Sequence, residues 1–107
     1  MKSFKTHKSF QEILRKDLKN PKESLGYLKA ALEDEDKRVF LMALSDVAEA
    51  YGGMTKLSHT ARISREHLYR IFSKHGNPEF ATLINLLDVL GFKLTLEPKN
   101  RKLKKAA

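Results

Sequence analysis

Residues 64–70 carry the side chains of this sequence that are best suited to hydrogen bonding with a large polar partner. Leu68 and Ile71 recur there at helical spacing, so one side of the segment is expected to be buried. Ser64 is a favourable N-cap for such a helix. The opposite side then presents polar and charged residues, namely Arg65, Glu66, His67, Tyr69 and Arg70. A helix with such a face is suited to the major groove of DNA.

A second short helix is predicted just before this one. Leu57 and Ala61 lie one helical turn apart, and Ile63 follows in a tight connection. The segment after Met54 therefore predicts two short helices with one buried side and a turn between them. This is the pattern of a helix-turn-helix, in which the second helix reads DNA bases.

The chain before this pair predicts three more helices. Phe10 to Leu18 has apolar residues at the spacing of an amphipathic helix. Asn20 is expected to cap the next helix, with Pro21 in its first position and its end near Leu32. A longer apolar run at helical spacing extends from Val39 to Tyr51.

Four carboxylates stand in a row at residues 33–36, an arrangement that also suggests a metal or acid/base site. They directly precede the third of these helices, where the helix dipole favours negative charge. We therefore expect the acidic run to cap that helix. Gly52-Gly53 should end the helix, because glycine takes positive φ without strain.

The chain after the pair predicts one helix and one strand. Asn77 and Pro78 repeat the arrangement of a capping asparagine and a first-turn proline, for a helix that ends near Leu90. Phe92 to Glu97 alternates apolar and polar residues with a period of two and is followed by Pro98. We expect a short strand there, which must pair with another segment or with a second molecule.

Residue types argue against catalysis and metal binding. The chain has four histidines and no cysteine, and no two histidines are four residues apart as in HExxH zinc sites. Its serines lack a histidine or lysine at a known motif spacing, and no glycine-rich loop precedes a lysine. We expect no enzyme activity, no cofactor and no metal.

The net charge of +8 over 107 residues points to a polyanion as partner. A basic but otherwise ordinary soluble protein is the alternative. Much of the charge lies in two lysine-rich ends, Met1 to Ser9 and Lys99 to Ala107, which are expected to be flexible arms. No apolar run is long enough for a membrane span or a secretory signal, so we expect a cytoplasmic protein with no membrane partner.

The segment ISREHLYRIFSKHGNPEFATLINLLDVLGFKL resembles the lambda-repressor-like helix-turn-helix of Xre-type regulators. Together with the upstream segment YLKAALEDEDKRVFLMALSDVAEAYGGM, it resembles the small HigA-like addiction-module antidote proteins, and this similarity covers roughly residues 17 to 97. The resemblance implies an antitoxin of a type II toxin-antitoxin module. Such a protein represses its own promoter as a homodimer on double-stranded operator DNA and neutralises a RelE/HigB-like toxin.

The resemblance also assigns roles to residues. Arg65, Glu66 and Arg70 match positions that read bases in this class, and arginine suits a bidentate contact with guanine. A solvated position explains Glu66 equally well, and a partly exposed packing position explains Tyr69 equally well. For His67, packing is the favoured interpretation. Lys56 and Lys74 are expected at the edge of the DNA-facing surface, where phosphate contacts set register. The predicted DNA-binding residues are Ser64, Arg65, Glu66, Tyr69, Arg70, Lys74 and Lys56.

Three positions depart from the family pattern. Arg62 stands in the turn where glycine is usual, so an arginine is expected at positive φ or in an altered turn. Ser58 replaces the usual alanine of the first helix, and it is small enough to pack. Met54 stands where many members have a phosphate-contacting glutamine, which removes that contact.

The expected fold is all-α: a lambda-repressor-like helix-turn-helix domain with an N-terminal helical extension and one short C-terminal strand. Residues 1–36 form the arm and extension, residues 37–98 the DNA-binding domain, and residues 99–107 a basic tail. The helices from Phe10 to Leu32 are the candidate toxin-binding part, or else extra core packed on the helix that ends at Tyr51. The alternative functions are a stand-alone regulator and a toxin inhibitor that no longer reads DNA.

Overall fold

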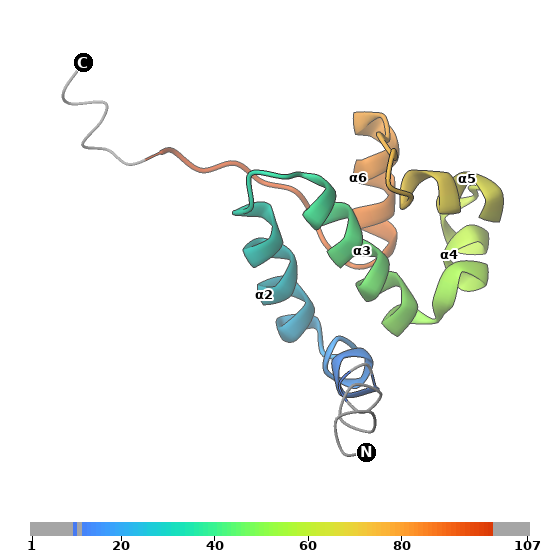
Figure 1. The fold of residues 1–107 in the computed structure, drawn as a ribbon, viewed down its shortest axis with the longest axis horizontal. Coiled ribbons are helices and arrows are strands. Elements are labelled where there is room, and N and C mark those ends of the chain that lie inside the picture. The colour runs from blue at the N-terminus through green and yellow to red at the C-terminus, as the bar shows by residue number, and fades with distance from the viewer. Residues whose placement is uncertain (1–9, 11, 100–107) are drawn as a thin grey trace.

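A computed structural model of the chain describes residues 10 and 12–99, which are helices and their connections (Figure 1). Residues 10 and 12–17 are helical and precede the longer helices. Those helices are α2 (Pro21–Leu32), α3 (Arg38–Tyr51), α4 (Gly53–Ala61), α5 (Arg65–Ile71) and α6 (Phe80–Val89). The predicted all-α class is confirmed for this part of the chain. Within it, no helix is long and apolar enough to cross a membrane.

The start of α2 has the predicted cap. The Asn20 side chain accepts a hydrogen bond from the Lys22 N–H at 2.9 Å, and Pro21 occupies the first position. Ser24 is buried, and its hydroxyl donates to the Leu18 carbonyl at 2.6 Å. This bond joins the end of the first helical stretch to α2, so the two segments are held at a defined angle.

One side of α2 packs against α3 and belongs to the hydrophobic core. Leu28 is only 4% exposed and joins a cluster that includes Phe40 and Leu44 of α3. The Tyr27 hydroxyl donates to the Asp46 carboxylate at 2.5 Å. Burial, together with this hydrogen bond and the charge of Asp46, raises the pKa of Tyr27 to about 12. The sequence left two roles open for the N-terminal helices, namely toxin binding or extra core. For Leu28, the role as extra core is confirmed.

A different side of the N-terminal helices faces solvent. Phe10 is 56% exposed, Ile13 is 55% exposed, and Leu25 of α2 is 47% exposed. Leu14 packs partly against the core. The N-terminal extension thus divides its apolar residues between the core and an open surface.

Two residues of the acidic run accept backbone hydrogen bonds before α3: Asp34 Oδ1 accepts from the Asp36 N–H at 2.8 Å, and Asp36 bonds to the start of the helix. The N-cap position of α3 is Lys37, which makes no side-chain capping bond. Asp36 Oδ1 instead accepts from the Arg38 N–H at 2.9 Å, and its Oδ2 lies 2.8 Å from the Arg38 guanidinium. These two bonds to Arg38 lower the pKa of Asp36 to about 2. In the part of the chain that the structure describes, no group of acidic residues and histidines is arranged to hold a metal ion.

Two features of the C-terminal part differ from the sequence prediction. Asn77 does not cap α6, which begins at Phe80 with Glu79 as its N-cap, two residues after Asn77. Just before this cap, the backbone of Gly76 approaches the end of α5 so closely that a Cβ there would lie 1.8 Å from the Ile71 carbonyl oxygen. The Gly76 N–H donates to the Ser73 carbonyl at 2.9 Å, and residues 77–79 connect this turn to the start of α6.

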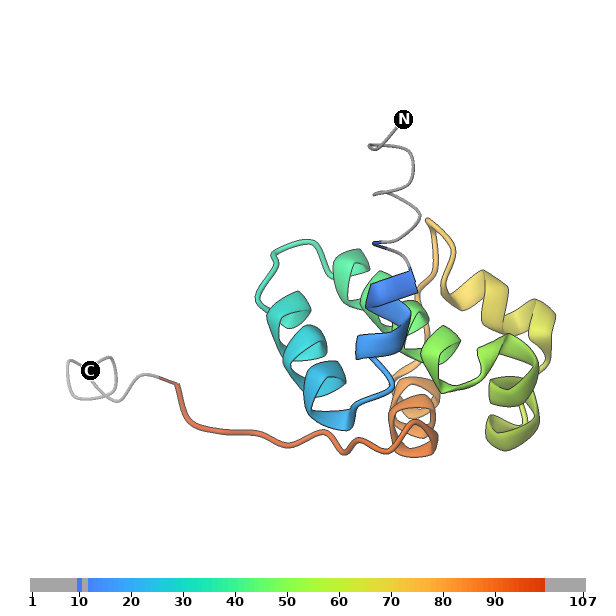
Figure 2. The same ribbon diagram turned by 90° about the horizontal axis from the view of Figure 1, so that it is seen from below.

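The predicted strand over Phe92 to Glu97 is wrong for the described chain, in which residues 92–99 have no regular secondary structure. After the Phe92 N–H donates to the Leu87 carbonyl at 2.8 Å, the chain leaves the helices (Figure 2). A strand requires a neighbouring strand for its hydrogen bonds, and the described helices offer none. Alternation of side chains predicts an extended conformation but does not provide a partner.

Candidate nucleic-acid interface

The candidate interface is built on α4 and α5, whose inner sides are buried as predicted. Leu57 of α4 and Leu68 of α5 are fully buried, and Leu86 of α6 is buried with them. The side-chain amide of Asn85 donates to the Ala61 carbonyl at 3.0 Å, which ties the end of α4 to α6. Asn85 is a polar residue on a largely apolar helix and belongs to no recognisable motif, so this contact cannot be predicted from the sequence.

The turn between α4 and α5 is held by Ser58. The Ser58 carbonyl accepts hydrogen bonds from the N–H groups of Arg62 and Ile63, and its hydroxyl donates to the Ile63 carbonyl at 2.5 Å. Serine in place of alanine therefore adds a bond that closes the turn. Arg62 has φ 60° and ψ 44°, the left-handed conformation. The expectation of an arginine at positive φ is confirmed.

Replacing Arg62 by glycine should stabilise the protein. A residue with a Cβ is strained in the left-handed region, whereas glycine is not, although glycine loses more backbone entropy on folding. We expect the free energy of unfolding to rise by about 0.5 to 1 kcal/mol, measured by urea denaturation. Arg62→Ala is the control, because it removes the same side chain and keeps the strain. A gain in both variants would mean that the arginine side chain, and not its backbone, is unfavourable.

Helix α5 starts with the predicted cap and presents its polar residues to solvent. The Ser64 hydroxyl accepts from the His67 N–H at 3.1 Å. The exposed residues of the helix are Arg65, Glu66, His67, Tyr69 and Arg70. One helix thus holds five of the predicted DNA-binding residues, including its cap, on or beside a single exposed face.

Arg65 and Tyr69 form a pair on this face. The Arg65 Nη2 donates to the Tyr69 hydroxyl at 3.3 Å, and the guanidinium carbon lies 5.7 Å from the ring centroid. Contact with the ring restricts the arginine side chain to fewer rotamers than it would have in open solvent. The N–H groups that do not contact the tyrosine stay available to a partner. The arrangement is suited to a bidentate hydrogen bond with a planar acceptor such as guanine.

Arg70 is one of the residues that line a cleft of about 500 Å³ between α5 and the start of α6. The same cleft is lined by His67, Ser73, His75 and Asn77, all from α5 or the loop that follows it. Glu79 and Thr82, at the start of α6, line the cleft as well, and the Ser73 hydroxyl donates to the Arg70 carbonyl at 2.7 Å. The cleft therefore combines the cationic Arg70 with the acidic Glu79 and several neutral polar side chains.

The two predicted lysines lie apart from this group. The Lys56 ammonium is 4.6 Å from the centroid of the Tyr51 ring, at the junction of α3 and α4. Lys74 follows α5 and lines a different hollow, together with Asp36 and Arg38. The structure therefore gathers Ser64, Arg65, Glu66, Tyr69 and Arg70 on α5, with Lys56 and Lys74 on separate parts of the surface.

The fold and this site define a small all-α protein with one exposed basic and aromatic helix face. The chain matches, over residues 8–98, the family described as "Probable addiction module antidote protein". It belongs to this family, whose members are antidotes of addiction modules. A protein of Haemophilus influenzae described as uncharacterized is 35% identical to it over 71 residues, which is 66% of this chain and 72% of that protein. No solved structure matches the chain at a significant level.

Proposed function

We propose that this antidote protein represses transcription of its own module by binding operator DNA through α5. The observation that supports this most directly is the division of α5 into two sides. Leu68 and Ile71 are buried, while Arg65, Tyr69 and Arg70 project outward from the same two turns. An interface of this kind places a few side chains at base edges and uses surrounding cations for phosphate.

The rest of the surface is consistent with a nucleic-acid partner. The net charge of +8 favours association with a polyanion at moderate ionic strength. Ser64 holds the start of α5 in a fixed conformation, and Arg65 is oriented by Tyr69. The proposed role is binding, with no catalytic step.

We propose that the protein binds DNA as a homodimer. Two copies related by a two-fold axis place their α5 helices in successive major grooves, about 34 Å apart. The operator is then a palindrome with half-sites one helical turn apart.

The toxin, in this proposal, is a RelE/HigB-like protein that contacts the exposed apolar residues of the N-terminal helices. Phe10 and Ile13 are more than half exposed, and Leu25 is nearly so. These three apolar side chains are exposed on the N-terminal extension itself, so they are the residues of that extension that a toxin could bury. Leu28, by contrast, is buried in the core and is not accessible to a partner protein.

The proposed DNA function is tested by nuclease footprinting of the purified protein on the promoter of its own gene. A palindromic footprint supports an autoregulating repressor. A footprint there with no toxin gene beside it would favour the stand-alone regulator. The absence of any protected site, with toxin binding retained, would favour the inhibitor that no longer reads DNA.

The toxin surface is tested by Phe10→Ser combined with Ile13→Asp. If a toxin buries these side chains, each loss removes about 1.5 to 3 kcal/mol of binding free energy, enough to abolish capture of the co-expressed toxin. Operator binding should be unchanged. Met42→Asp is the control, because Met42 is an exposed apolar residue of α3 outside the N-terminal extension. Equal loss of toxin capture in the control and the double variant would contradict the assignment.

A further inference from the structure

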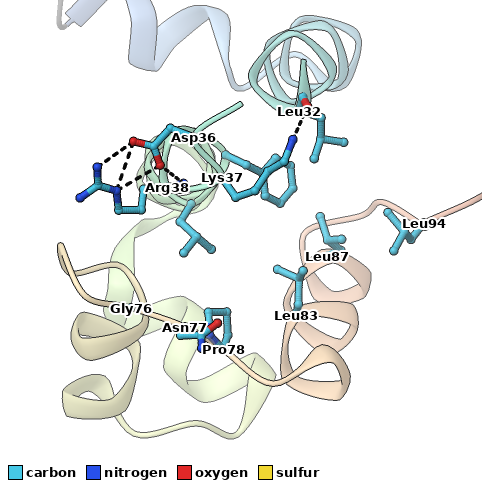
Figure 3. A pocket seen from close by; sticks show the side chains of 12 residues that line it. Leu32, Asp36, Lys37, Arg38, Gly76, Asn77, Pro78, Leu83, Leu87 and Leu94 are labelled. Atoms are coloured by element: carbon cyan, nitrogen blue, oxygen red, sulfur yellow. Dashed lines mark hydrogen bonds and ion pairs between the residues drawn. The ribbon is translucent and has the colours of Figure 1, made fainter. Parts of the chain in front are cut away.

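An apolar groove of about 470 Å³ lies between the start of α3 and the inner side of α6 (Figure 3). Its walls include Phe40 and Leu41 of α3, and Leu83 and Leu87 of α6. Figure 3 shows Leu83 and Leu87 pointing into the opening from the same helix. A groove of this size accommodates several side chains of an extended peptide segment.

Cations stand at one rim of this groove. Lys37 is the N-cap residue of α3 and Arg38 is its first residue. The Lys37 ammonium donates to the Leu32 carbonyl at 3.0 Å and to the Asp34 carbonyl at 2.9 Å, which leaves one N–H for a further acceptor. Asp36 lies beside them and is paired with Arg38. The rim therefore offers a fixed ammonium group next to apolar walls, which suits a segment with leucine followed by a carboxylate.

The segment Phe92–Lys99, which we call the C-terminal arm, has such a sequence. Leu96 is 97% exposed, the most exposed large apolar side chain of the described chain, and Glu97 follows it directly. Beyond Phe92, the described residues of the arm make no backbone hydrogen bond to the rest of the described protein. Leu94 and Leu96 alternate along the arm, so an extended conformation puts both on one side.

The arm starts at the edge of the groove but runs away from it. Leu94 is part of the lining, while the residues after it extend away from the helices (Figures 1 and 2). Its residues 95–99 span up to about 17 Å when extended. Because groove and arm begin at the same edge, two copies facing each other across a two-fold axis can exchange arms reciprocally.

We propose that the groove binds the C-terminal arm of a second copy of this chain, with Leu96 between α3 and α6 and Glu97 near Lys37. The exchange covers the exposed leucine, fills the open groove and brings opposite charges together. It deepens the proposed function, since it rests on the proposed homodimer and names the surface that forms it. Each copy supplies both the arm and the groove, so the contact closes on itself and stops at two chains.

Disulfide trapping tests the exchange, because the chain has no cysteine of its own. One preparation carries Leu96→Cys, and a second, tagged preparation carries Asn77→Cys, at an exposed residue that lines the groove. Mixed and oxidised, they should give the mixed disulfide as the main product. A partner with Met42→Cys, exposed on α3 but outside the groove, should not. Equal trapping by both partners, or no mixed disulfide, would overturn the proposal.

A single chain that carries both Leu96→Cys and Asn77→Cys distinguishes two arrangements. In one, two copies exchange arms; in the other, the arm binds the groove of its own chain. A disulfide within single chains would show the arm in its own groove and would overturn the proposal, whereas bonds between chains support it.

Leu96→Ser provides the energetic test by sedimentation equilibrium. Loss of one buried leucine should weaken dimerisation at least about tenfold. The thermal midpoint of the monomer should not change, since Leu96 makes no contribution to the core. A dimer of unchanged strength, or a wild-type protein that is monomeric throughout, would overturn the exchange.

These outcomes are distinguishable from failure of the proposed function. A wild-type protein that protects its promoter but dimerises without the arm refutes the exchange alone. A wild-type protein that exchanges arms but protects no promoter DNA refutes the repressor alone.

Discussion

The Leu28→Asp protein will fail to unfold cooperatively, or will lose at least about 4 kcal/mol of its free energy of unfolding. The substitution removes a buried leucine and puts a carboxylate between α2 and α3, where the neighbours are Phe40 and Leu44. A buried charge without a partner is among the most destabilising changes known. Since small domains are stable by about 5 to 15 kcal/mol, little or no stability should remain.

Leu25→Asp is the matched control for this experiment. It introduces the same side chain in the same helix three residues earlier, at a position that is 47% exposed. We expect a cooperative transition close to that of the wild type by thermal and urea denaturation. Similar behaviour of the two variants would show that α2 is not packed on α3 as described. The result also matters for toxin binding, because a variant at Leu28 reports on folding and not on the partner.

Arg65→Ala and Arg70→Ala should each weaken binding to the operator by about 1 to 3 kcal/mol and relax the preference at one base pair. Both side chains are exposed on α5, and Arg65 is already oriented by the Tyr69 hydroxyl. Fluorescence anisotropy with the operator and with single-base variants of it measures both effects. Thermal unfolding should be unaffected, because neither side chain contributes to the core.

Arg15→Ala controls for the loss of one positive charge. Arg15 is exposed in the helical stretch before α2. We expect a small loss of affinity, equal for all DNA sequences, because a general attraction to phosphate carries no sequence information. If Arg65→Ala and Arg70→Ala show the same uniform loss, α5 contacts phosphates only. If they show no loss, α5 is not the DNA-reading helix.

Local signals in the sequence were sufficient for most of the helices. Asn20 with Pro21 started α2, and Ser64 started α5, because a capping bond involves only residues two or three apart. The positive φ at Arg62 was implied by the family resemblance, because Arg62 stands at the turn position where glycine is usual. The outward residues of α5 were predictable for the same reason: burying Leu68 and Ile71 places the intervening residues outside.

Contacts between distant residues decided the rest. Periodicity marked Phe10, Ile13 and Leu28 equally as apolar, yet only Leu28 is buried, because only that position faces α3. The N-cap of α6 is Glu79 and not Asn77, and the close approach of Gly76 to the end of α5 just before it is a tertiary feature that no capping signal contains. Alternation over residues 92–97 likewise predicted an extended chain but not a strand, since a strand exists only when another segment accepts its hydrogen bonds. The sequence determined which residues can be apolar, capped or extended, whereas the tertiary structure decided which of them have a neighbour to contact.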